Sequence, residues 1–193
     1  MEERKGLPVL AFAGPGEWHA WLAEHDTTSA GLWLKLAKKG AAVVTVTYAE
    51  AVDVALCHGW IDGLAGGYDD TFWLQRFTPR GPRSKWSQIN REKAERLIEA
   101  GLMQPAGLAA IEAARQDGRW DNAYPSSGTA TVPADLQAAL DDNPDAAAFF
   151  ATVSQSNRYA VIMRVQDAKR AQTRARRITQ YVEMLARGEK IHP

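Results

Sequence analysis

Leucine alternates with other residues at 32–36. Leu32, Leu34 and Leu36 fall on one side, and Trp33 and Lys35 fall on the other. Because successive side chains of a strand point to opposite faces, this pattern predicts a β-strand with a partly covered back. Short apolar runs bounded by turn residues predict further strands at 7–12, 43–46, 60–66 and 71–77, the last two forming an antiparallel hairpin around 67–70.

Elsewhere the apolar spacing is that of helices, and local signals mark their ends. Thr47 and Glu50 form a Thr-x-x-Glu capping box, Ser87 is a typical N-cap, and Gly59 is a typical stop. The last helix carries an apolar stripe made of Ala171, Ala175, Ile178, Val182 and Leu185. The helices expected are 14–26, 48–59, 88–101, 105–118, 133–143, 144–153, 156–168 and 168–188.

The predicted strands all precede the segment 120–133, which is rich in Ser, Gly, Thr and Pro, and only helices follow it. This order predicts an α+β fold, with a small mixed or antiparallel sheet and packed helices, followed by an all-helical domain. We expect an α+β domain at 1–125, a linker at 126–132 and a helical domain at 133–193.

The composition is that of a folded globular protein, with 46% apolar and 24% charged residues among 193. Lys plus Arg equals Asp plus Glu at 23 each, so the charge of the whole chain favours neither nucleic acid nor a membrane surface. The N-terminal apolar run is too short for a signal peptide, and no window reaches the length of a membrane span. With a single cysteine, Cys57, we expect a cytoplasmic protein without a disulfide framework.

The stretch "RFTPRGPRSKWSQIN", residues 76–90, concentrates positive charge just before a predicted helix start. Helix N-termini favour anions, arginines add forked donors, and two prolines stiffen the backbone between them. We therefore predict a site for a small anionic or planar ligand, with tryptophan walls. The alternative is a solvated basic loop whose arginines pair with nearby carboxylates such as Asp69. The predicted ligand-binding residues are Trp60, Arg76, Arg80, Arg83, Trp86, Ser87 and Asn90.

A second candidate lies in "CHGWID", where His58 and Asp62 straddle a predicted helix end. His58 as general base and Asp62 as its orienting partner would make the protein an enzyme, with Arg76 and Arg80 stabilising an anion. The same two residues also suit a hydrogen-bonded structural corner, so the sequence leaves open whether the protein is an enzyme. Cys57 is expected to be a buried structural residue. The histidines are scattered and no nucleotide-binding glycine loop is present, so neither a metal nor a cofactor is expected.

Basic residues dominate from Arg158 to Lys190, whereas the segment 135–145 is acidic. The simplest interpretation is that these two groups face one another or a neighbouring molecule, which makes a protein partner or self-association through the C-terminal helices an alternative function. Nucleic acid is not the expected partner, because no recognised DNA-reading module surrounds the last helix and the chain is neutral.

Three segments, "TYAEAVDVALCHGWIDG", "RFTPRGPRSKWSQIN" and "AKRAQTRARRITQYVEMLARG", are similar in sequence and order to the YdeI/OmpD-associated family of bacterial proteins. The resemblance covers nearly the whole length. It implies the two-part architecture and a role in stress or in protection against bacteriocins, and it assigns no settled biochemical activity.

Overall fold

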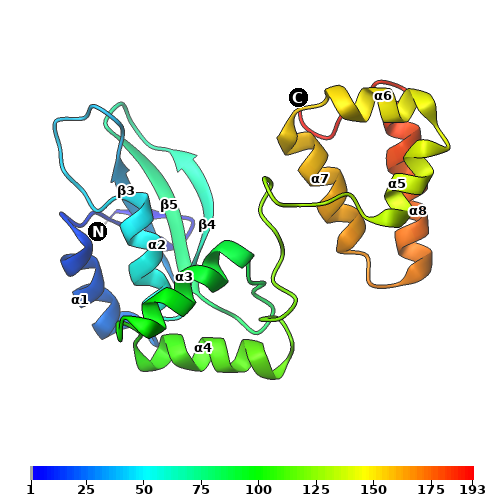
Figure 1. The fold of residues 1–193 in the computed structure, drawn as a ribbon. Coiled ribbons are helices and arrows are strands. Elements are labelled where there is room, and N and C mark those ends of the chain that lie inside the picture. Colours follow the sequence, from blue (N-terminus) through cyan, green and yellow to red (C-terminus); the bar gives the residue numbers. More distant parts are fainter. Residues whose placement is uncertain (1) are drawn as a thin grey trace. The chain divides into compact units, whose positions relative to one another are not determined.

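The computed structural model describes residues 2–193, which divide into two compact units. The first unit ends at Tyr124 and the second begins at Pro125. The first contains the five strands and four of the eight helices of the described chain, and the second contains the other four helices. Figure 1 shows α5 to α8 grouped in the second unit. The predicted α+β class is confirmed.

The first unit is built on a mixed sheet whose strand order is β1-β2-β3-β5-β4. Strands β2 and β3 are parallel because a helix connects them, and the other neighbouring pairs are antiparallel. The predicted hairpin is present as β4 and β5, with a register shift between Asp62 and Ala65. The strands are β1 (Glu3–Arg4), β2 (Leu7–Leu10), β3 (Leu32–Ala37), β4 (Trp60–Gly67) and β5 (Phe72–Pro79).

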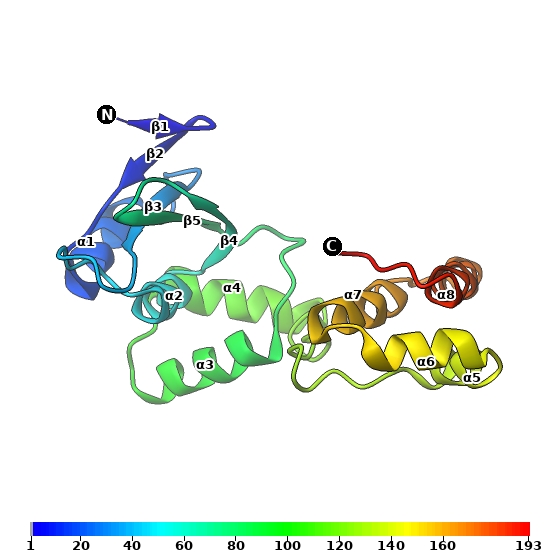
Figure 2. The ribbon, with the colours of Figure 1, turned by 90° about the horizontal axis from the view of Figure 1, so that it is seen from above.

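Four helices pack on one face of this sheet, with α1 and α2 nearest to it (Figure 2). The predicted capping box of Thr47 and Glu50 opens α2, and the Ser87 hydroxyl accepts the amide of Asn90 at the start of α3. Proline occupies the first turn of α1 and α4, where its missing N–H costs nothing. The helices are α1 (Pro15–His25), α2 (Tyr48–Cys57), α3 (Gln88–Glu99) and α4 (Pro105–Gln116).

The two faces of the sheet have separate apolar clusters. Leu32, Leu34 and Leu36 point to the helices, as their alternation predicts, whereas Trp33 lies on the other face with Val9 and Leu74. The main core continues from the sheet into the helices through Trp18, Leu22, Ala51, Ala55, Leu56, Trp60, Phe77, Trp86, Ala94, Ile111 and Trp120.

The strand predicted at 43–46 is wrong, because this segment is an irregular loop. The Thr45 hydroxyl accepts the amide of Ala37, which takes the place of a ladder bond. Val44 is 81% exposed, so the apolar residues here do not form a buried run.

The second unit contains the helices α5 (Ala134–Asp141), α6 (Pro144–Thr152), α7 (Gln155–Gln166) and α8 (Ala171–Ala186) around their own core. On α8, Ile178, Val182 and Leu185 are buried as predicted, but Ala171 and Ala175 are exposed, so the buried stripe is shorter than expected. Within residues 2–193, no helix combines the length and the apolar character needed to cross a membrane.

Candidate functional site

The basic stretch 76–90 begins on β5 and ends in the first turn of α3. Arg80 follows the last residue of β5, and its amide donates to the carbonyl of Gly59. A short exposed turn comes next, in which the Ser84 hydroxyl accepts a hydrogen bond from the amide of Gly81. The stretch therefore connects the sheet to α3, as its prolines and its N-cap serine predict.

Arg80 packs against Trp86 within this stretch. The guanidinium carbon lies 3.6 Å from the centroid of the indole ring, a cation–π contact. One nitrogen, Nη1, donates to the carbonyl of Lys85 at 3.2 Å, while Nε and Nη2 are buried without a hydrogen-bond partner among the described residues. The indole Nε1 of Trp86 is buried and unpartnered as well. Buried donors without acceptors are uncommon in folded proteins, so this stacked pair is unusual.

The charge on Arg80 is only partly compensated. Burial lowers the pKa of Arg80 to about 10, and the nearby Arg119 acts in the same direction. Tyr124 and Asp62 oppose that shift without pairing directly with the guanidinium. The guanidinium of Arg119 is itself engaged, by Asp117 and by the carbonyl of Ser84. Arg80 is thus a desolvated cation whose donors are not used up by the protein.

The other predicted ligand-binding residues do not all gather around Arg80. Alternation along β5 puts Arg76 on the face opposite Phe77, with Leu74, whereas Arg80 stacks on a residue of the main core. Arg83 is exposed in the turn. The carboxylate of Asp69, one of the expected internal partners, accepts the amides of Thr71 and Phe72 instead of an arginine.

The expectation that two tryptophans line the site is corrected by their burial. Trp60 is 0% exposed and donates its indole N–H to the carbonyl of Asp26. Trp86 is 1% exposed because Arg80 covers it. Both rings belong to the main core, so neither is a free wall for a ligand.

The pairing expected between His58 and Asp62 is also wrong. Nδ1 of His58 lies 2.9 Å from Oδ2 of Asp26, and Nε2 lies 3.0 Å from Nδ1 of His19. Asp62 instead accepts the hydroxyl of Tyr48 at 2.7 Å, which helps to raise the pKa of Tyr48, although burial is the larger cause. His58 follows the end of α2 and faces α1, whereas Asp62 lies beyond the Gly59 turn on β4.

Sequence reasoning missed His19 and Asp26, which lie on α1 and just after its last residue. They are seven residues apart, a spacing that puts two helical residues on one face two turns apart. That spacing was the available signal, but nothing local indicated that His58 would come between them.

Residues 10–110, just over half of the chain, match the family model of a domain of unknown function, DUF8412. The chain belongs to the DUF8412 family. Residues 129–188 match a second family model, described as bacteriocin-protection, YdeI or OmpD-associated, so the predicted resemblance is confirmed for this part of the chain. No curated protein and no solved structure is a match.

Both candidate regions fall within the DUF8412 match, because Arg80, His58, His19 and Asp26 all lie between residues 10 and 110. The family description assigns no activity to them. Among residues 2–193, no group of three or more His, Cys, Asp or Glu side chains is placed to hold a metal ion.

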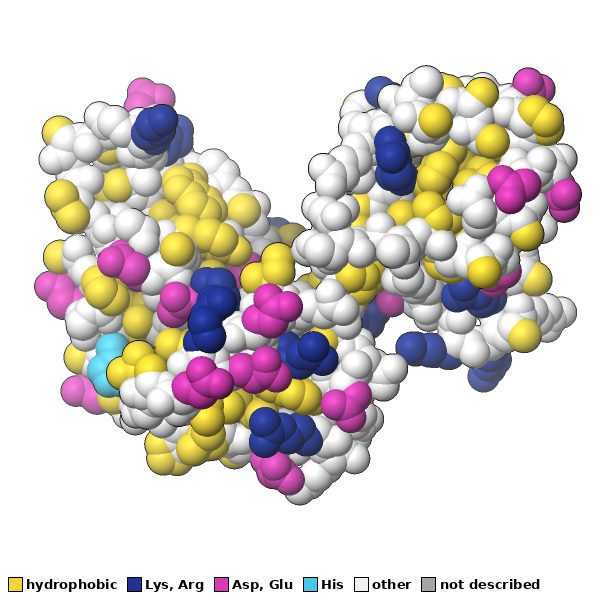
Figure 3. Space-filling view, viewed as in Figure 1, with side chains coloured by type: hydrophobic (Ala, Val, Ile, Leu, Met, Phe, Trp, Pro, Cys, Tyr) yellow, Lys and Arg dark blue, Asp and Glu magenta, His cyan; other side chains and the backbone are white. Residues whose placement is uncertain are grey.

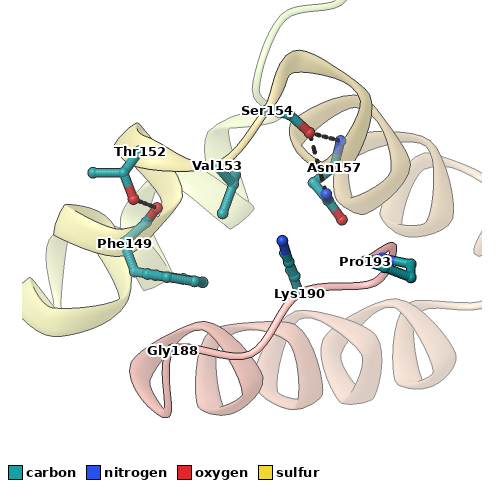
Figure 4. Close-up of a pocket in the computed structure, with 8 residues that line it drawn as sticks. All are labelled: Phe149, Thr152, Val153, Ser154, Asn157, Gly188, Lys190 and Pro193. Atoms are coloured by element: carbon teal, nitrogen blue, oxygen red, sulfur yellow. Dashed lines mark hydrogen bonds between the residues drawn. The ribbon is translucent and has the colours of Figure 1, made fainter.

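The YdeI/OmpD-associated region has a pocket of its own, of about 450 Å³. Figure 4 shows the Lys190 side chain pointing into it between Phe149 and Asn157. None of the residues predicted to bind ligand lines this pocket. Two arginines of this basic segment pair within the second unit: Arg174 on α8 makes two hydrogen bonds to Asp135, and Arg187, just after α8, pairs with Glu189.

Proposed function

We propose that the DUF8412 region binds a small anionic ligand at Arg80. The observation that carries the proposal is the pair of buried, unpartnered donors, Nε and Nη2, on a guanidinium stacked against Trp86. An unsatisfied buried donor costs free energy, and a carboxylate or phosphate oxygen is the acceptor that a guanidinium matches best.

The surroundings of Arg80 favour an anion over a neutral ligand. Arg119 lies close enough to lower the pKa of Arg80, so a negative group would relieve repulsion between two cations. The turn at 81–83 is exposed and adjacent to Arg80, and it is the expected route by which a ligand reaches the guanidinium. Because both tryptophans are in the core, recognition rests on hydrogen bonding to Arg80 and not on ring stacking.

Thermal unfolding in phosphate, sulfate or acetate tests this proposal with Arg80→Met, which keeps an apolar stem against Trp86 but removes the donors. A charge-assisted hydrogen bond contributes roughly 1.5–3 kcal/mol, so anion affinity should fall about ten- to a hundredfold and the anion-induced rise in Tm should disappear. Without anion the variant should unfold at the same temperature as wild type or higher, because it removes unpaired buried donors.

Arg187→Met is the matched control, since Arg187 is exposed and pairs with Glu189 just after α8. It should respond to anions like wild type. The proposal fails if Arg80→Met keeps the full anion response, or if Arg187→Met loses it equally.

We further propose that the protein, through this anion binding, acts in stress or bacteriocin resistance; the bacteriocin-protection description of the model matched at residues 129–188 supports the second of these. We place the protein in the cytoplasm, where the free thiol of Cys57 would persist. Cells lacking the protein should survive bacteriocin exposure less well than cells carrying it, and cells carrying only Arg80→Met should behave like the deletion. Equal survival of all three would remove this role without affecting the binding proposal.

A further inference from the structure

A pocket of about 520 Å³ opens between α1, α2 and the segment that joins α3 to α4. Its apolar lining includes Pro15, Val54, Leu97 and Leu102. His19 also lines it and is exposed, and through this histidine a chain of hydrogen-bonded polar side chains reaches the pocket.

The chain consists of Asp26, His58 and His19, joined by contacts of 2.9 Å and 3.0 Å, and His58 is its buried middle member. An ionised Asp26 accepts from Nδ1–H of His58, so Nε2 of a neutral His58 is an acceptor. Nδ1 of His19 is then the donor to it, which leaves Nε2 of His19 as an unprotonated nitrogen. This nitrogen has no hydrogen-bond partner among the described residues.

This arrangement lets His19 accept a proton and transfer the positive charge to the buried ring of His58. A proton that binds Nε2 of His19 allows the Nδ1 proton to move to His58, whose charge then rests beside the carboxylate of Asp26. His58 is 2% exposed, so its ring is held rigidly for this transfer. An imidazole oriented by a carboxylate is the usual arrangement of a general base.

The same helix supplies a hydrogen-bond donor to the pocket. Gly16 lies one turn before His19 on α1 and also lines the pocket. Its amide belongs to the first turn, where helical N–H groups have no partner within the helix, and Gly14 provides no side-chain cap. Gly16 and His19 both line the pocket, so this amide and the His19 ring border the same space.

Charges in the lining select against anionic substrates. Two carboxylates, Glu50 and Asp53, lie there, and among the described lining residues none is Lys or Arg. Lys93 pairs with Asp53 and offers no free cation. Cys57 also lines the pocket, but burial raises the pKa of its thiol to about 11, so it remains protonated at neutral pH and is a poor nucleophile.

We propose that this pocket is a hydrolytic site for small uncharged carboxylic esters, with His19 as general base, His58 and Asp26 as positioning residues and the Gly16 amide as oxyanion donor. Nε2 of His19 removes a proton from water as the water oxygen bonds to the acyl carbon. The carbonyl oxygen becomes negative and accepts from the Gly16 N–H. The ester C–O bond then breaks, the leaving oxygen recovers the proton, and the carboxylic acid departs.

Hydrolysis of 4-nitrophenyl acetate and 4-nitrophenyl butyrate by the full chain tests the proposal. Wild type should show saturable release of nitrophenolate, and His19→Gln should lower kcat/KM about a hundredfold, the usual contribution of a general base. Asp26→Asn should lower kcat about tenfold with KM unchanged. It should also slow acylation of His19 by diethyl pyrocarbonate, which a purely structural role would not affect.

One variant serves as the control. His25→Gln changes a histidine on the same helix that stacks on Trp21 and does not line the pocket, and it should hydrolyse both esters like wild type. Wild-type hydrolysis no faster than that of His19→Gln, or an equal loss of activity in His25→Gln, would overturn the proposal.

Discussion

Gly107, in the first turn of α4, lies directly against the carbonyl group of Cys57 at the end of α2. A Cβ atom at position 107 would overlap that oxygen and the terminal methyl of Met103. The same carbonyl accepts the amide of Gln104, so α2 and α4 are joined at this point by a hydrogen bond and by close backbone contact.

Gly107→Ala should therefore destabilise the protein even though alanine is the better helix former. Helix propensity favours alanine by about 1 kcal/mol, but overpacking against rigid backbone costs roughly 1–3 kcal/mol or more. We expect a net loss in the free energy of unfolding, measured by urea titration. Gly16→Ala is the control, because Gly16 is helical with no atom within 4 Å of a Cβ there, and it should be neutral or stabilising. Similar losses in both variants would contradict the packing argument.

Alkylation of Cys57 by iodoacetamide should be slow in the folded protein. Burial, with a smaller contribution from Asp53, raises the pKa of the thiol to about 11, and only the thiolate reacts. At pH 8 roughly one molecule in a thousand would carry a thiolate, so the rate should be about a hundredfold or more below that of a free cysteine. Mass spectrometry over time measures it, and unfolding in guanidinium should restore the ordinary rate. A folded protein that reacts as fast as the unfolded one would refute this.

The ion pair between Arg174 and Asp135 should make the free energy of unfolding of the second unit depend on pH in the acid range. Hydrogen bonds from Arg174 hold the pKa of Asp135 below its usual value. The stabilisation is therefore present above the ordinary carboxyl pKa and is lost as pH falls through the lowered one. Because the Asp135 side chain is 46% exposed, we expect a loss below about 1 kcal/mol.

Urea titrations of the full chain between about pH 6 and pH 3 should reveal this loss in wild type and a smaller one in Asp135→Asn. Asp142→Asn, which changes an exposed acid nearby, should follow wild type. An identical acid dependence in Asp135→Asn and wild type would show that the pair contributes nothing.

Local signals in the sequence predicted local structure well. The capping box at Thr47 and Glu50, the serine cap at Ser87 and the hairpin of β4 and β5 are all present, since each depends on residues close together in the chain. The strand prediction at 43–46 was wrong although valines favour strands, because the segment is an irregular loop in which Val44 is exposed.

Contacts between distant residues were not predictable in the same way. His58 meets Asp26, 32 positions away, and His19, 39 positions away, because α1 and α2 pack side by side. The nearby Asp62 looked like the natural partner, yet the turn at Gly59 directs it to another element. On the face shown in Figure 3, Lys/Arg and Asp/Glu side chains are interspersed over α3 and α4, so this surface carries both signs of charge.

The irregularity in β4 has a consequence for how the protein behaves at high concentration. β4 is the outermost strand of the sheet, and an outermost strand normally offers free amides and carbonyls on which another chain can add. The shift between Asp62 and Ala65 interrupts that row, and Arg4 donates to the carbonyl of Gly67 near the end of the strand. The row of free backbone groups on β4 is thus interrupted in the middle of the strand, and the carbonyl of Gly67 is already hydrogen-bonded near its end. Both features disfavour the addition of another chain to this edge and so protect the sheet from edge-to-edge aggregation.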